Sequence, residues 1–177
     1  SKLRIGLAVG FSLITVYFGM GFQFNEKTQT YQSLNLLSGL APPVNYSCMY
    51  PIECPNGLEC YHDFDVAMEM ANKNNKPVLV DFTGHSCTNC RRMEDNVWSQ
   101  DKVFTLINDD YILVSLYVDD SEVLPEDKQG EITINNSDGS QKQKKIKTVG
   151  DKWATFETLR FGKVSQPFYV LLSPDGY

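Results

Sequence analysis

Basic residues and histidine are scarce in this sequence of 177 residues. Lysine and arginine number 16 against 22 aspartates and glutamates, which gives a net charge of −6, and there are only two histidines. A protein that binds nucleic acid needs a basic surface to neutralise phosphates. The acidic balance therefore argues against a nucleic-acid partner, while 42% hydrophobic residues suffice for one globular domain with a core.

Cysteine is too scarce for a disulfide-rich scaffold of this size. The five cysteines cannot all pair within the chain, and they are Cys48, Cys54, Cys60, Cys87 and Cys90. A structural zinc site needs four ligands, for which the candidates are Cys48, Cys54, Cys60, His62 and His85. Five residues separate Cys54 from Cys60 and no second Cys-x-x-Cys exists. Redox chemistry is therefore favoured over zinc, and we expect neither a metal nor a cofactor.

Only one long hydrophobic run occurs, at residues 5–22, and it contains no charge. A helix that crosses a bilayer needs about 20 apolar residues, so residues 1–24 are predicted to form a transmembrane helix. Lys2 and Arg4 precede the run, and basic residues favour the cytoplasmic side. The rest of the chain is then expected outside the cytoplasm. A signal peptide is the alternative, although no small-x-small cleavage pattern follows promptly.

Beyond this run the chain divides into a lead-in and a domain. Residues 25–60 are polar, then rich in proline and asparagine, without a steady period, which predicts a linker. Residues 61–177 carry the helical and strand patterns of the domain. The chain starts with Ser1 instead of methionine and stops at a turn signal, which indicates a piece of a longer protein.

Helical and strand patterns alternate within the domain. Helices are predicted from Asp63, as N-cap, and over residues 87–98, 101–110 and 151–162, and strands at 77–82, 111–118 and 167–172. This alternation predicts crossovers and a parallel core, and therefore a layered α/β fold. The polar residues 119–150 interrupt the order, and "NNSDGS" within them predicts an inserted hairpin or loop. On the last helix Trp153, Phe156 and Leu159 are expected to face inward.

The two cysteines of "CTNC" follow a predicted strand and a short turn. Cys87 then begins a helix, where free N–H groups and the positive end of the helix dipole favour a thiolate. Because the thiolate attacks disulfides, Cys87 is the expected nucleophile. Cys90, one turn deeper, is expected to resolve the mixed disulfide by attacking Cys87. Arg91, Arg92 and His85 are candidates to add positive potential, although solvated surface charge is the favoured interpretation for both arginines.

Asp81 stands in the otherwise apolar strand pattern "PVLVDF". A carboxylate is costly to bury without partners. We therefore expect a partly buried carboxyl beneath the redox pair, with a raised pKa, that takes a proton from Cys90. An exposed aspartate at the strand end is the alternative.

The stretch "VLVDFTGHSCTNC" resembles the active-site strand and helix of thioredoxin, including an aspartate six residues before the first cysteine. Thioredoxin-like domains also have a cis-proline that faces the Cys-x-x-Cys, and "SQPFYVLL" matches that pattern with Pro167. Together with "YHDFDVAMEMA" and the N-terminal apolar run, these motifs resemble the C-terminal periplasmic part of the DsbD family over about residues 60–177. The resemblance implies a thioredoxin-like α/β fold, a central sheet flanked by helices, whose final strand and helix are missing. The insertion at 119–150 departs from the family.

The same resemblance implies a protein-disulfide reductase in the bacterial inner membrane, with its redox domain in the periplasm. Electrons are then expected to pass from a membrane electron-donor domain of the same longer protein to periplasmic protein disulfides. The alternatives are a disulfide oxidase or isomerase, a thiol peroxidase, and a Cys-x-x-Cys metal carrier. Cys48, Cys54 and Cys60 match no motif of the family, and two of them are expected to form a structural disulfide, the pairing staying open.

Overall fold

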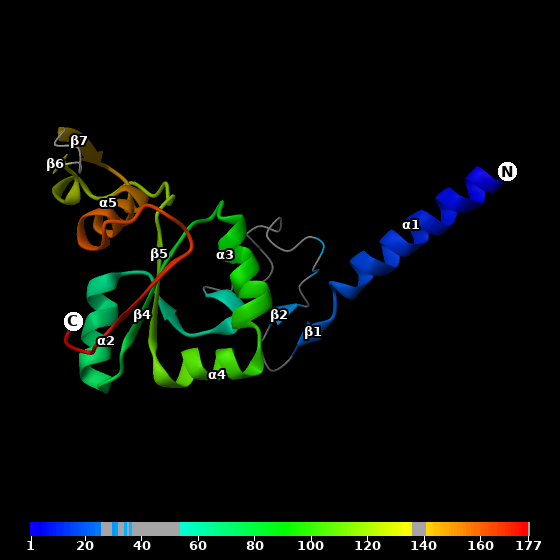
Figure 1. Cartoon of the computed structure of the whole chain (residues 1–177), viewed down its shortest axis with the longest axis horizontal. Coiled ribbons are helices and arrows are strands. Elements are labelled where there is room, and N and C mark those ends of the chain that lie inside the picture. The colour runs from blue at the N-terminus through cyan, green and yellow to red at the C-terminus, as the bar shows by residue number, and fades with distance from the viewer. Residues whose placement is uncertain (26–29, 32–33, 35, 37–53, 136–140, 177) are drawn as a thin grey trace.

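The computed structural model describes residues 1–25, 30–31, 34, 36, 54–135 and 141–176, and its centre is a four-stranded sheet (Figure 1). The strands lie in the order β3 (Cys60–Tyr61), β5 (Ile112–Tyr117), β4 (Val78–Thr83) and β8 (Phe168–Leu172). β4 and β5 form the predicted parallel core, and β3, which was not predicted, is parallel to β5. β8 is an antiparallel edge strand beside β4, because the chain returns from α5 (Val149–Phe161) at the end of the sheet where β4 finishes and Phe168 pairs with Phe82.

Helices cover both faces of the sheet, which confirms the predicted α/β fold. α2 (Phe64–Asn74) and α5 pack on one face, and α3 (Thr88–Met93), the π-helix η2 (Glu94–Trp98) and α4 (Asp101–Asp110) lie on the other (Figure 1). The Asp63 carboxylate caps α2, as predicted, by accepting hydrogen bonds from the N–H groups of Asp65 and Val66. Such a cap satisfies donors that the first helical turn leaves without partners.

Successive side chains of a strand point to opposite faces, and this sorts the core into two clusters. The cluster under α2 and α5 contains Ala67, Ala71, Val78, Val80, Phe82, Val114, Leu116, Trp153 and Leu172. The cluster under η2 and α4 contains Leu58, Trp98, Ile107 and Leu113. Leu58 follows the short 3₁₀ helix η1 (Pro55–Gly57). Packing of the domain therefore begins a few residues before the predicted boundary at residue 61.

The insertion at 119–150 contains the predicted hairpin. β6 (Gly130–Asn135) pairs antiparallel with β7 (Gln141–Ile146), and the 3₁₀ helix η3 (Glu126–Lys128) precedes it. Its base is fastened to the start of α5, since the Val149 N–H donates to the Glu122 carbonyl and the Gly150 N–H donates to the Asp120 carbonyl. A Cβ at Gly150 would lie 2.6 Å from the Asp120 backbone nitrogen, so no larger residue fits there without movement.

The inward face of α5 differs in one position from the prediction. Trp153 is buried and Phe156 packs against the core, but Leu159 is 60% exposed. The helical phase instead turns Glu157 and Phe161 toward the domain. The carboxyl of Glu157 is fully buried, which makes it an unexpected polar member of this face.

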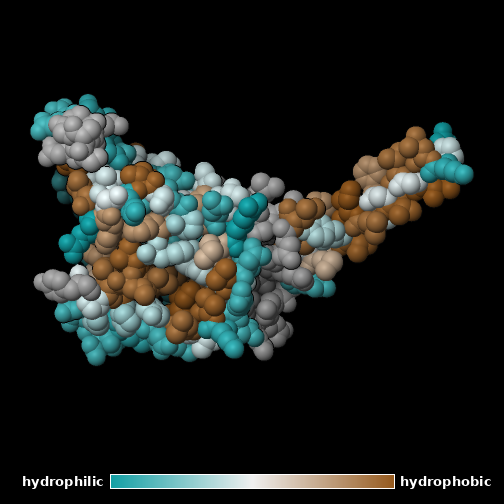
Figure 2. Space-filling model, viewed as in Figure 1, coloured by the Kyte–Doolittle hydropathy of each residue, from teal (hydrophilic) through white to brown (hydrophobic). Residues whose placement is uncertain are grey.

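The N-terminal helix α1 (Lys2–Met20) has no buried residue, and apolar side chains cover much of its visible surface (Figure 2). Its length and composition match a membrane span, and a signal sequence meets the same criterion. It is followed by a short antiparallel pair, β1 (Phe24–Asn25) with β2 (Thr30–Tyr31). Much of the predicted linker at 25–60 lies outside the described residues.

Candidate functional site

One face of the sheet changes from apolar to polar toward the end at which β4 and β5 finish. The cross-strand pairs on this face are, in order, Leu79 with Leu113, Asp81 with Ser115 and Thr83 with Tyr117. α3 covers these polar pairs, since Nη2 of Arg91 in α3 donates to the Thr83 hydroxyl at 3.2 Å. The period of two along β4 thus places Asp81 under the helix that carries the cysteines.

Cys87 is the N-cap of α3, and its sulfur accepts the Cys90 N–H at 3.2 Å. The two cysteines are joined in a disulfide with their Cα atoms 5.2 Å apart. Cys87 is partly exposed, whereas Cys90 is 1% exposed. The helix start therefore presents one sulfur to solvent and buries the other, as the positions in the sequence predicted.

Asp81 is 1% exposed. This confirms the expected burial of its carboxyl and excludes the alternative of an exposed aspartate at the strand end. Its Oδ2 accepts a 3.3 Å hydrogen bond from the Ser115 hydroxyl, and its Oδ1 has no hydrogen-bond partner among the described residues. Burial raises the pKa of Asp81 to about 7, although the Arg91 charge and the Ser115 hydroxyl oppose this rise. A carboxyl with this pKa can exchange a proton near neutral pH.

Arg91 is 6% exposed, so its expected place on the solvated surface is wrong, whereas Arg92 is exposed as expected. The Nη2 atom of Arg91 lies 2.6 Å from Oε1 of Glu94, which is also buried. The pattern "CRRME" offered a signal for this contact, because residues three apart share a helix face. Glu94 was not among the residues predicted from the sequence.

Asp81 and Glu94 share the single buried guanidinium of Arg91. Burial raises the pKa of Glu94 to about 8, with Arg91 lowering it and Asp81 adding to the rise. One cation can neutralise only one carboxylate at low cost. The 2.6 Å contact keeps Glu94 beside Arg91, and near neutral pH the two carboxyls share one proton beside this cation.

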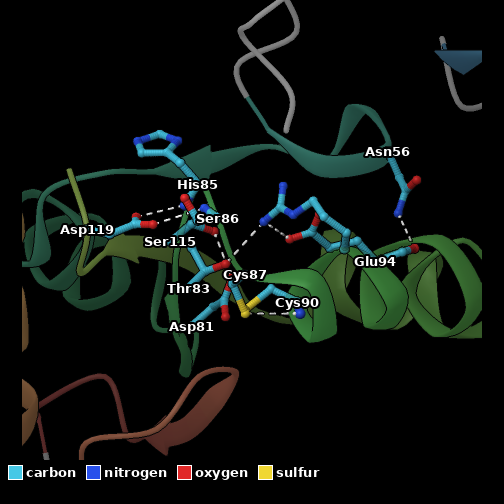
Figure 3. Close-up of polar contacts among 11 residues, drawn as sticks. Asn56, Asp81, Thr83, His85, Ser86, Cys87, Cys90, Glu94, Ser115 and Asp119 are labelled. Carbon is cyan, nitrogen blue, oxygen red and sulfur yellow. Dashed lines mark hydrogen bonds and ion pairs between the residues drawn. A yellow bond between two sulfur atoms is a disulfide. The ribbon is translucent and has the colours of Figure 1, made fainter. Parts of the chain in front are cut away.

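The turn before Cys87 is held by Asp119, the first residue of the insertion. Its two carboxylate oxygens accept the His85 N–H at 2.7 Å and the Ser86 N–H at 2.9 Å (Figure 3). The His85 ring stacks on Tyr117 with centroids 4.2 Å apart, and its Nε2 lies 3.9 Å from an Asp120 oxygen. The insertion therefore fixes the backbone that carries the exposed sulfur.

Pro167 follows a cis peptide bond and directly precedes Phe168, which pairs with Phe82 of β4. It therefore lies beside the end of β4 from which the chain turns toward Cys87. The segment before it is held by Glu157, whose Oε1 accepts the Ser165 N–H at 3.0 Å and whose Oε2 accepts the Gln166 side-chain amide at 2.9 Å. Glu157 is a second site residue that was not predicted, because a glutamate in a helical pattern usually lies on the exposed face of the helix.

A family model described as thioredoxin-like matches residues 59–174. The chain belongs to the thioredoxin-like family. Among solved structures, "DsbH Oxidoreductase" is similar over 76% of this chain and 78% of its own length, with 15% identity and a TM-score of 0.47. A thioredoxin from Thermus thermophilus is similar over 60% of this chain and 93% of its own, with 16% identity and a TM-score of 0.33. No curated protein sequence matches the chain.

The thioredoxin-like domain carries a second disulfide, between Cys54 and Cys60, with Cα atoms 5.9 Å apart. The sequence left open which two of Cys48, Cys54 and Cys60 form a disulfide, and the structure pairs Cys54 with Cys60. Cys48 lies outside the described residues. The predicted zinc candidates are only partly brought together: Cys54, Cys60 and His62 have their ligand atoms within 4.8 Å of one another. His85 instead belongs to the turn before Cys87.

Proposed function

We propose that this chain is a membrane-tethered protein-disulfide reductase. The observation that carries the proposal is the Cys87–Cys90 pair, with a partly exposed sulfur at a helix N-terminus and a buried one above the Asp81 layer. Cys87 attacks a disulfide of a partner protein, which forms a mixed disulfide and releases one partner thiolate. Cys90 then attacks Cys87, which closes the intramolecular disulfide and releases the second partner thiol.

Asp81 serves the second step in this proposal. The Cys90 thiol must lose its proton to attack, and a carboxyl with a pKa near 7 can accept that proton when it is ionised. Pro167 and the segment held by Glu157 offer backbone groups at the end of β4, where an extended partner segment can pair. Cys87, Cys90, Asp81 and Pro167 are thus the proposed catalytic set, with no metal or cofactor in the reaction.

The charges around the pair and the N-terminal helix support the proposed direction of electron flow. A strongly oxidising pair needs uncompensated positive charge that stabilises its thiolate. Among the described residues, Arg91 is the buried cation next to Cys90, and its guanidinium is paired with Glu94. The α1 helix, as an anchor, would hold the domain next to a membrane electron donor and raise its effective concentration. These features favour reduction, with the domain in the periplasm as in the DsbD family that the sequence resembles.

Two measurements on the full chain test the proposal. In the Cys54→Ser/Cys60→Ser background, equilibration with glutathione is expected to give a potential nearer the ~−270 mV of thioredoxin than the ~−120 mV of a strong oxidant. In cells, Cys90→Ser is expected to trap mixed disulfides with partners, while the matched variant Cys87→Ser traps none. A potential near that of the oxidant would reverse the direction, and equal trapping by the two variants would overturn the assigned roles.

A further inference from the structure

The Cys54–Cys60 disulfide has a histidine beside it that a structural crosslink does not require. Cys54 is 5% exposed, whereas Cys60, in the edge strand β3, is partly exposed. The Nε2 atom of His62 lies 3.9 Å from Sγ of Cys60. This contact is too long for a strong hydrogen bond, but it places a ring nitrogen next to the accessible sulfur.

The opposite side of the His62 ring determines which nitrogen carries the proton. Nδ1 lies 3.2 Å from the backbone carbonyl oxygen of Ser115. A carbonyl oxygen only accepts hydrogen bonds, so Nδ1 is the donor and the neutral ring has its lone pair on Nε2. The ring also lies against Tyr117, with centroids 5.8 Å apart. Its orientation is therefore set by two contacts from β5, and the lone pair points toward the sulfur.

The contacts of His62 are those of a metal-binding histidine whose second ring nitrogen is held by a hydrogen bond. Metal-binding histidines commonly donate their second N–H to a backbone carbonyl, which sets the tautomer and the ring plane. The two sulfurs and Nε2 lie within 4.8 Å of one another. Zinc lies about 2.3 Å from thiolate sulfur and about 2.0–2.1 Å from imidazole nitrogen. Ligands of one zinc ion therefore stand roughly 3.5–4 Å apart, a spacing that the sulfurs reach once their bond is broken.

We propose that reduction of the Cys54–Cys60 disulfide opens a metal site formed by Cys54, Cys60 and His62, suited to a thiophilic ion such as Zn²⁺. A protein dithiol supplies two electrons and two protons to the disulfide and becomes a disulfide itself. The two cysteine thiols formed then lose their protons to solvent as the ion binds, while His62 binds through Nε2. Three protein ligands leave one position of a tetrahedral zinc site for water.

The site differs from the Cys87–Cys90 pair in its histidine. Among the described residues, Cys54, Cys60 and His62 form the group whose ligand atoms lie close enough to hold one ion. The surroundings of the two disulfides share Ser115 but use different atoms of it, since His62 contacts the Ser115 carbonyl whereas Asp81 contacts the Ser115 hydroxyl. Metal binding at one site can therefore be measured with the other removed.

Zinc titration of the full chain in detergent tests this proposal. Cys87→Ser/Cys90→Ser removes the thiols of the other pair, and the Cys48→Ser control described below accounts for the fifth cysteine. A phosphine reduces the Cys54–Cys60 disulfide, and a chromophoric chelator competes for Zn²⁺. We expect one zinc per reduced chain, no stoichiometric zinc before reduction, and an affinity lowered at least about tenfold by His62→Ala. His62→Cys, which returns a third ligand, is expected to recover the affinity and so separates ligand loss from misfolding.

Matched variants define the outcomes that overturn the proposal. Cys48→Ser and His85→Ala are expected to leave the zinc affinity unchanged, because neither residue belongs to the proposed site. Equal binding before and after reduction, no binding after reduction, or an unchanged affinity in His62→Ala would each refute it. With Co²⁺ as the probe, the reduced chain is expected to show thiolate-to-cobalt charge transfer, and the absence of this band would also refute the site.

Discussion

The two disulfides of this domain are the same covalent bond in two different settings. Cys87–Cys90 begins a helix and lies over buried carboxyls, whereas Cys54–Cys60 joins η1 to an edge strand and lies beside an imidazole. In each pair one cysteine is buried and the other partly exposed. The exposure of the cysteines therefore does not distinguish the two disulfides. The groups around each disulfide do distinguish them.

A carboxyl and an imidazole support different chemistry next to sulfur. The layer of Asp81, Arg91 and Glu94 holds one mobile proton under Cys90, as a proton-coupled exchange reaction needs. His62, fixed by the Ser115 carbonyl, offers a lone pair to a metal ion. The comparison is the basis of the two proposals, dithiol exchange at Cys87–Cys90 and, after reduction, metal binding at Cys54–Cys60.

The largest expected effect is the loss of reductase turnover. Cys87→Ser and Cys90→Ser are each expected to reduce turnover of a protein disulfide to background, because both thiols take part in every cycle. Cys54→Ser/Cys60→Ser is expected to stay within about threefold of the unmodified chain. A loss to background in this control would mean that both pairs carry electrons, and the comparison would fail.

The second effect concerns stability. Removing the Cys54–Cys60 crosslink is expected to lower the free energy of unfolding by about 2 kcal/mol, as loop-closure entropy predicts for a short loop. Denaturant unfolding of the oxidised chain and of Cys54→Ser/Cys60→Ser measures the difference. No difference would show that the disulfide does not restrain the unfolded chain, and would leave the metal site as its only proposed role.

The third effect sharpens the role of the buried carboxyls. Because the pKa values of Asp81 and Glu94 are raised, the folded chain binds more protons than the unfolded chain between about pH 4 and 8. The free energy of unfolding therefore falls as the pH rises through this window. Asp81→Asn is expected to flatten the fall and to raise stability at pH 8 by about 1–2 kcal/mol, since each pKa unit corresponds to about 1.4 kcal/mol.

Thermal unfolding at several pH values measures this change. The exposed residue Asp127 provides a control, and Asp127→Asn is expected to leave the pH dependence unaltered. Resolution of the mixed disulfide should also slow in Asp81→Asn while the first attack keeps its rate. An unchanged pH profile, or an equal slowing of both steps, would contradict a proton role for Asp81.

The smallest expected effect comes from Glu157. Glu157→Gln keeps one acceptor oxygen and so loses one of the two hydrogen bonds to Ser165 and Gln166. We expect the free energy of unfolding to fall by about 1 kcal/mol. If that segment positions the partner, KM for a protein disulfide rises severalfold while kcat changes little. Glu131→Gln on the exposed hairpin is the control. A fall in kcat with an unchanged KM would argue against a binding role.

Much of the fold could be predicted because local patterns agree with it. Continuous apolar runs with β-branched residues coincide with β4, β5 and β8, and Asp63 caps α2 as predicted. The direction of β8 could not be predicted, since a strand pattern reads the same in both directions. Leu159 was misplaced for a related reason: apolar spacing suggested the inward face, and packing placed the buried Glu157 there instead.

The sequence by itself determined that Cys87 and Cys90 lie at a helix start with Asp81 beneath them, because these positions depend on spacing within one strand and one helix. Only the tertiary structure decided which cysteines pair at Cys54–Cys60, that Arg91 is buried against Glu94, and that Ser115 lies between Asp81 and His62. Those contacts join residues from different elements, or depend on what covers a helix face. The spacing in "CRRME" allows the Arg91–Glu94 contact but does not encode its burial, because burial and the fit between neighbouring elements arise only when the chain packs.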